Sequence, residues 1–83
     1  MKILYFSWVR QKVGVAEEDI TPPPDLRDVT ALIGWLKSRG EGYEAAFENP
    51  KLIRVAVDQT HAEFDAPIAG AQEIAFFPPV TGG

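Results

Sequence analysis

The chain has 83 residues, with eight Lys and Arg against twelve Asp and Glu, one His and no Cys. This length fits one domain, and a hydrophobic content of 46% is typical of a folded protein. The formal net charge of −4 argues against nucleic acid as a partner, because phosphate binding needs clustered positive charge. Without cysteine there is no disulfide, thiolate zinc site or thiol nucleophile, and a single histidine disfavours a metal site of nitrogen ligands.

The N-terminus gives no sign of export or membrane insertion. Lys2 is followed by an apolar run that is too short for a signal peptide and has no cleavage site. No stretch reaches the length that a membrane span requires. We therefore expect a cytoplasmic protein that does not bind membranes.

The first part of the chain predicts two strands. Residues 2–9 are rich in β-branched and aromatic side chains and are expected to form one strand. Residues 10–14 are polar, end in glycine and predict a loop. Residues 15–21 predict a second strand whose acidic residues 17–19 are solvated. The three prolines at 22–24 forbid ladder hydrogen bonds and predict a stiff connector.

A helix is predicted to begin after Asp28, which is a good N-cap. Four apolar residues then follow at i, i+3, i+4 and i+7 and form one stripe for packing on a sheet: Val29, Leu32, Ile33 and Leu36. Lys37 and Arg39 suit the last turn, and Gly40 suits the C′ position. Trp35 lies off the stripe and is expected at the rim of the core.

The second half predicts a short helix within residues 41–49 and then three strands. Residues 52–58 alternate cleanly and give the strongest strand signal. Residues 59–64 predict a short edge strand, and 71–77 are expected to form the last strand after a turn at 65–70. In the first of these strands Ile53, Val55 and Val57 share one face. In the last strand Ile74 and Phe76 are expected to face inward and Phe77 outward.

This order of elements predicts an α+β domain of the β-grasp (ubiquitin-like) type, in which one main helix lies across a mixed sheet of four to five strands. A ferredoxin-like fold is the alternative, but it needs a second full helix, for which residues 43–47 are too few. We expect the domain to span residues 1–77 and residues 78–83 to form a flexible C-terminal tail.

The C-terminal sequence 76–83, FFPPVTGG, has the properties of an extended tail that can enter another protein. Pro78 and Pro79 lack backbone N–H groups, so they end sheet pairing and send the chain off as an extended stalk. Gly82 and Gly83 have no Cβ, so a narrow channel can close around their backbone. We expect the tail to place its terminal carboxylate in another protein's active site. A frayed, inert terminus is the alternative.

Further short motifs accompany this ending: ILYF at 3–6, Val9-Arg10, Val13-Gly14, VDQT at 57–60, Phe64-Asp65, Pro67 and EIA at 73–75. Together with FFPPVTGG they make the chain resemble the small subunit of molybdopterin synthase over nearly its whole length. Asp58 stands where that family usually has Asn in a VNQ motif, which leaves any specific amide contact at this position open.

The resemblance implies a ubiquitin-like sulfur carrier without a permanently bound cofactor. A ubiquitin-activating-type adenylating enzyme would use ATP to convert the Gly83 carboxylate into an acyl-adenylate, and a sulfur donor would convert it into a thiocarboxylate. The large synthase subunit, which holds the catalytic side chains, would then transfer the sulfur to cyclic pyranopterin monophosphate in molybdenum cofactor biosynthesis. The family complex is a heterotetramer of two small and two large subunits.

The resemblance also implies roles for single residues. Gly83 accepts and donates the sulfur, and Gly82 gives it steric access. Phe6 and Phe77 match partner contacts. On a period of two they lie opposite Ile3 and Tyr5, where exposed aromatics would mark an interface and loops covering the face are the alternative. His61 falls where the interface often has an aliphatic residue, and a solvent-facing position is favoured over a catalytic one. The expected partner-binding residues are Phe6, His61, Phe77, Pro78, Pro79, Val80 and Thr81, the last two through backbone hydrogen bonds.

Two other functions stay open. One is a Gly-Gly carrier for thiamine, tRNA thiolation or protein conjugation, against which FFPPVTGG argues. The other is a ubiquitin-like interaction module with an inert tail. A free-standing enzyme is disfavoured, because the sequence offers no nucleophile–base pair.

Overall fold

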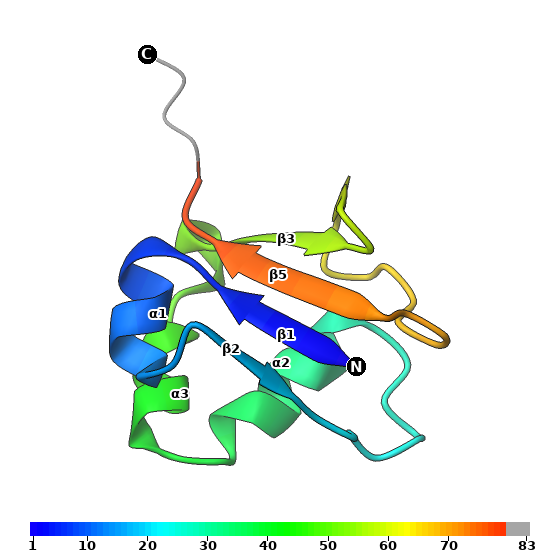
Figure 1. Cartoon of the computed structure of the whole chain (residues 1–83), viewed down its shortest axis with the longest axis horizontal. Helices are drawn as coiled ribbons and strands as arrows, with labels where there is room; N and C mark the ends of the chain where they lie inside the picture. The colour runs from blue at the N-terminus through cyan, green and yellow to red at the C-terminus, as the bar shows by residue number, and fades with distance from the viewer. Residues whose placement is uncertain (80–83) are drawn as a thin grey trace.

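The computed structural model describes residues 1–79. One mixed sheet has the strand order β2-β1-β5-β3-β4, and the helices pack behind one of its faces (Figure 1). The strands are β1 (Lys2–Tyr5), β2 (Glu17–Asp19), β3 (Arg54–Val57), β4 (Thr60–Ala62) and β5 (Glu73–Phe77). The helices are α1 (Ser7–Val13), α2 (Val29–Lys37), α3 (Glu41–Ala46) and the 3₁₀ turn η1 (Pro50–Leu52).

The centre of the sheet brings the first and last strands together. β5 runs parallel to β1, with Ile3 opposite Ile74, and antiparallel to β3, with Val55 opposite Phe76. β2 pairs antiparallel with β1 at one edge of the sheet, and β4 pairs antiparallel with β3 at the other edge. Parallel neighbours need a crossover connection, and α2 lies on the sheet within that connection. This topology confirms the β-grasp prediction.

One hydrophobic core lies between the sheet and the helices. The helical stripe is confirmed, since Val29, Leu32 and Leu36 are fully buried and Ile33 is nearly so. The sheet contributes the buried side chains Ile3, Tyr5, Ile53, Val55, Ile74 and Phe76. The N-cap is also confirmed, because the Ala31 N–H donates to Asp28 Oδ1 at 2.9 Å. Trp35 is half-buried beside the core, as expected.

The prediction of one strand over residues 2–9 and a loop over 10–14 is wrong. β1 ends at Tyr5, the backbone turns at Ser7 with φ 56°, and α1 follows. Gly14 ends this helix in the left-handed region with φ 99°, which glycine adopts without a Cβ penalty. The aromatic residues of this segment mask the helical spacing of Val9 and Val13, both of which pack on the core.

The end of α2 also differs from the expectation. α2 ends at Lys37 with Ser38 as its cap, whereas Gly40 has extended backbone and is the N-cap of α3. The predicted short second helix is therefore present, and it begins immediately after this glycine. α3 lies close against α1, because a Cβ at Gly42 would meet the backbone carbonyl oxygen of Lys12.

The strands β2 and β3 are shorter than predicted at both ends. β2 covers only residues 17–19, so the outer parts of 15–21 are irregular. Leu52 belongs to η1 and Asp58 to a turn, so neither lies in β3. Asp58 and Gln59 have φ 48° and φ 69°, which are the positive values of a tight hairpin turn between β3 and β4. β4 lies at the sheet edge, as the sequence indicated.

Candidate functional site

The base of the C-terminal tail lies at the end of the central strand. β5 ends at Phe77, and the half-buried Pro78 and Pro79 follow it. Neither proline has an N–H to extend the ladder with β3, so the prediction that they end the sheet pairing agrees with the strand boundary. The predicted residues Val80, Thr81, Gly82 and Gly83 lie outside the described part of the chain.

The face of the sheet turned away from the helices carries a small apolar surface. Alternation along β5 places Ala75 and Phe77 on this face, because Ile74 and Phe76 face the core. The strand register sets Leu4 and Ala56 on either side of Ala75. Ala75 is only 8% exposed although no helix covers this face in the part of the chain that the structure describes (Figure 1).

Phe6 lies next to the end of β5, but not within a strand as the sequence predicted. Phe6 is not in a strand; it is the residue before α1, with extended backbone. Its N–H donates to the carbonyl oxygen of Phe76 at 3.1 Å, which fixes it at the end of the β1–β5 ladder. Its side chain is 48% exposed. The fold therefore brings both predicted aromatics to the end of the sheet from which the tail leaves.

His61 belongs to the same surface. It lies opposite Ala56 on the edge strand β4 and is exposed. Its ring centroid is 6.2 Å from that of Phe77, and the two rings meet edge to face at 63°. The predicted solvent-facing position is thus correct, and His61 extends the aromatic surface of Phe77 toward the sheet edge.

Sequence reasoning missed two neighbours of this surface, Leu52 and Arg54. Arg54 is opposite Phe77 in the β3–β5 register and is exposed. Leu52 is 51% exposed and lies in η1, where the sequence predicts a strand. Asn49 and Pro50 are the sequence signal for η1. The Asn49 side chain accepts from the Lys51 N–H, and Pro50 follows it, which is a helical N-cap pattern.

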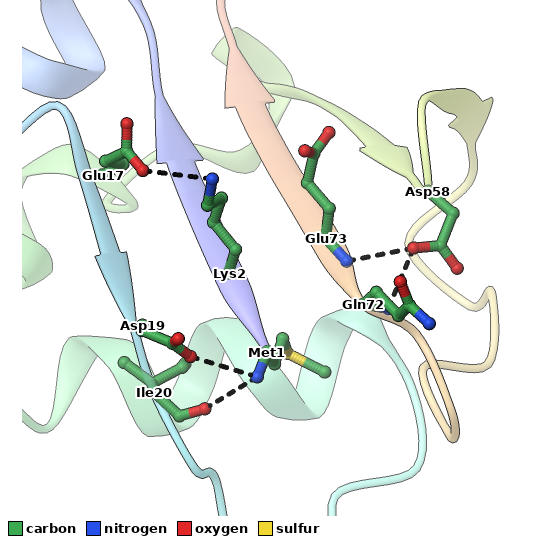
Figure 2. Close-up of polar contacts among 8 residues, drawn as sticks. All are labelled: Met1, Lys2, Glu17, Asp19, Ile20, Asp58, Gln72 and Glu73. Carbon is green, nitrogen blue, oxygen red and sulfur yellow. Dashed lines mark hydrogen bonds and ion pairs between the residues drawn. The ribbon is translucent and has the colours of Figure 1, made fainter.

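Asp58 fastens the other end of β5. Its Oδ1 accepts from the N–H groups of Gln72 and Glu73 at 2.9 and 3.0 Å (Figure 2). Both contacts use only an acceptor oxygen, which an asparagine also has. The departure from the family's Asn is therefore compatible with the same turn. A polar recess of about 450 Å³ lies beside this turn and is lined in part by Lys2 and Glu73.

Both strands next to the N-terminus are tied by polar contacts as well. The Met1 ammonium group donates to the Ile20 carbonyl oxygen at 3.1 Å and lies 3.3 Å from Asp19, and Lys2 lies 3.4 Å from Glu17 (Figure 2). The ion pairs are exposed and contribute little individually. They join β1 to β2 on the face that also carries Phe77.

Glu18 was expected to be solvated, and this is wrong. Its carboxylate accepts from the hydroxyl groups of Tyr5 and Tyr43 at 2.8 and 2.7 Å and lies 3.1 Å from Arg39. Burial opposes ionisation of Glu18, but the hydrogen bonds from Tyr43, Tyr5 and Arg39 outweigh it and lower its pKa. Burial and the hydrogen bond to Glu18 raise the pKa of both tyrosines. This network joins β1, β2 and α3 on the helix side of the sheet, so we assign it a structural role.

The described residues hold neither a metal cluster nor a helix that could span a membrane. Within residues 1–79 no group of three His, Asp or Glu side chains could hold a metal ion. In the same residues no helix has both the length and the apolar character needed to cross a membrane. The arrangement is an aromatic surface at the end of β5, next to Pro78.

Comparison with known proteins is consistent over the whole chain. The model of the ThiS family matches residues 3–83. The molybdopterin synthase sulfur carrier subunits of Escherichia coli and Haemophilus influenzae are 39% and 35% identical, each alignment covering 100% of this chain and 99% of the relative. A solved structure from Pyrococcus furiosus, described as a candidate molybdopterin converting factor subunit 1, has a TM-score of 0.75 and 29% identity, covering 95% of both chains. On these matches, the chain belongs to the ThiS family.

Proposed function

We propose that this chain is the sulfur carrier subunit of a molybdopterin synthase and acts in molybdenum cofactor biosynthesis. The observation that carries the proposal is the exposed aromatic surface of Phe6, His61 and Phe77, which lies where the central strand runs into the sequence PPVTGG. Two relatives with this name align over the full length of the chain.

The reactive group in this proposal is the carboxylate of Gly83. A carboxylate is a poor electrophile because its charge is delocalised, so it must first acquire a leaving group. An adenylating enzyme of the ubiquitin-activating type attaches AMP from ATP and releases pyrophosphate. A sulfur donor at the oxidation level of hydrosulfide then replaces AMP on the carbonyl carbon and leaves a thiocarboxylate. Because this activation consumes ATP, we place it in the cytoplasm.

The remaining residues of the proposed site act by binding. Phe6, His61 and Phe77 dock on the large subunit, which holds the catalytic side chains. Pro78 and Pro79 hold the tail away from the sheet. Val80 and Thr81 pair through their backbones with the receiving groove, and Gly82 lets the channel close around the terminus. The sulfur passes from Gly83 to cyclic pyranopterin monophosphate. We expect two small and two large subunits in the complex.

The first experiment is the intact mass of the chain after incubation with the adenylating enzyme of its host, ATP and sulfide. We expect a gain equal to one exchange of oxygen for sulfur. The control variants lack Gly83 or carry one extra alanine after it, and neither should gain mass. An unchanged mass of the natural chain, under conditions that load an established carrier, would overturn the sulfur carrier role.

A second experiment separates the proposed pathway from other Gly-Gly carriers. The loaded chain is mixed with the large subunit and cyclic pyranopterin monophosphate, and both the mass of the chain and the pterin product are followed. We expect the chain to return to its carboxylate mass as sulfur enters the pterin. Loading without this transfer would instead favour a carrier for thiamine, tRNA thiolation or protein conjugation.

A further inference from the structure

Leu52 is the most exposed large hydrophobic side chain within residues 1–79, at 51%, and Phe6 follows at 48%. A single exposed leucine has no meaning by itself, since much of any protein surface is apolar. Its position relative to the tail is informative.

The residues that lead into β3 place Leu52 near the end of β5. Arg54 lies opposite Phe77 in an antiparallel pair. Leu52 is the last residue of η1, two residues before Arg54, so it lies near the end of β5, where Pro78 follows. Ile53 between them is fully buried, so Leu52 and Arg54 turn away from the core.

Phe6 occupies the matching position on the other side. β1 is the other strand that pairs directly with β5, and the Phe6 N–H donates to the Phe76 carbonyl oxygen. The chain therefore leaves the sheet between two exposed apolar side chains from its two neighbouring segments. Here we name Phe6 and Leu52 together the collar.

We propose that Leu52 is a binding residue and that the large subunit of molybdopterin synthase closes an apolar rim over the collar when it takes up the tail. This inference rests on the proposed function. A protein that encloses the tail must press its channel mouth against the side chains next to Pro78 and Pro79. Apolar contact there keeps water from a reactive terminus inside the channel. Arg54 lies opposite Phe77, and the exposed Leu52 is two residues before Arg54, so Leu52 adjoins the surface that carries Phe77.

The test is the affinity of the full-length Leu52→Asp chain for the large subunit, measured by isothermal titration calorimetry. We expect a loss of about tenfold or more, as for residues at the centre of an interface. Leu52→Met keeps the apolar surface and should stay within about threefold of the natural chain. Ala45→Asp is the distant control, because it places the same charge on the exposed side of α3 and should bind normally.

Several outcomes decide the question. Thermal unfolding of each variant checks the fold, and Leu52→Ala replaces Leu52→Asp if the aspartate variant does not fold. Normal affinity of a folded Leu52→Asp or Leu52→Ala chain would overturn the role of Leu52 and leave the proposed function intact. If the natural chain itself does not bind the large subunit, the proposed function fails instead.

Discussion

The carboxylate of Glu18 lies 3.1 Å from the guanidinium group of Arg39, at the point where the edge strand β2 meets the helices. Arg39 also lies over the rings of Tyr43 and Trp35, at 5.0 and 5.2 Å from their centroids. Only 18% of the Glu18 side chain is exposed, so solvent screens this pair less than an ion pair on the open surface. The network joins segments that are far apart in the sequence.

We predict that this network makes the stability of the protein depend on pH in the acidic range. The pKa of Glu18 is lowered in the folded chain from its ordinary value of 4.5, so the unfolded chain binds more protons at acidic pH. The contribution of Glu18 is therefore complete above pH 4.5 and is lost as the pH falls through the lower, folded-state pKa. Glu18→Gln should reduce the free energy of unfolding at pH 7 by about 1–3 kcal/mol.

Denaturant unfolding between pH 3 and pH 7 tests this prediction. The difference in stability between the natural chain and Glu18→Gln should shrink toward acidic pH. Glu17→Gln on the exposed side of the same strand is the matched control and should show little effect. An equal loss at every pH would contradict the assignment to Glu18.

The contact between α1 and α3 gives a second prediction. A Cβ at Gly42 would lie against the backbone carbonyl oxygen of Lys12, and backbone cannot move away as a side chain can. Gly42→Ala should therefore destabilise the fold by about 1–3 kcal/mol, despite the better helix propensity of alanine. Gly34→Ala is the control, since its Cβ would meet nothing within 4 Å. Calorimetric melting temperatures compare the two, and equal values would refute the close contact.

Asp58 gives a third prediction, which concerns the family's usual asparagine. Asp58→Asn keeps the acceptor oxygen for the N–H groups of Gln72 and Glu73 and tolerates the positive φ of 48°. Its stability should stay within about 0.5 kcal/mol of the natural chain. Asp58→Ala loses both hydrogen bonds and should cost about 1–2 kcal/mol. Urea unfolding measures both variants, and a tolerated alanine would show that these bonds do not hold β5.

Phe77 gives a fourth prediction, which depends on the proposed function. Phe77→Ala removes the ring that His61 contacts edge to face and should weaken binding to the large subunit by about tenfold or more. Trp35→Ala is the aromatic control, because Trp35 lies on α2 behind the sheet and not on the docking face. Its affinity should be unchanged even if its stability falls. Equal losses of affinity in both variants would point to unfolding and not to a docking role.

The sequence predicted the elements that are long or have a clear period, together with their core residues. The stripe from Val29 to Leu36 and the alternation through Val55 and Phe76 needed no tertiary information. α1 was missed because Phe6 and Trp8 continue the β-rich composition of β1, and the reversal at Ser7 leaves no local signal of its own. Here tertiary packing of Val9 overrides propensity.

For the candidate site, the sequence identified the three aromatic-surface residues but not the residues that lie next to them. Phe6, His61 and Phe77 were named from motif and alternation, and the fold brings them to one face. Leu52 and Arg54 were not, because their proximity to the tail depends on the register of β3 against β5. Register depends on pairing between distant segments, so no local pattern in residues 50–54 predicts it.

The strand order also determines when this protein can fold during synthesis. β5 is the last described strand to be made, yet it is the central one, and β1 and β3 are joined in the sheet only through it. In a growing chain that lacks residues 73–77, the pairs β1–β2 and β3–β4 have no strand to join them. The docking face comes into existence only when the segment that carries the tail has emerged. An incomplete chain of this topology therefore lacks the binding surface that β5 completes.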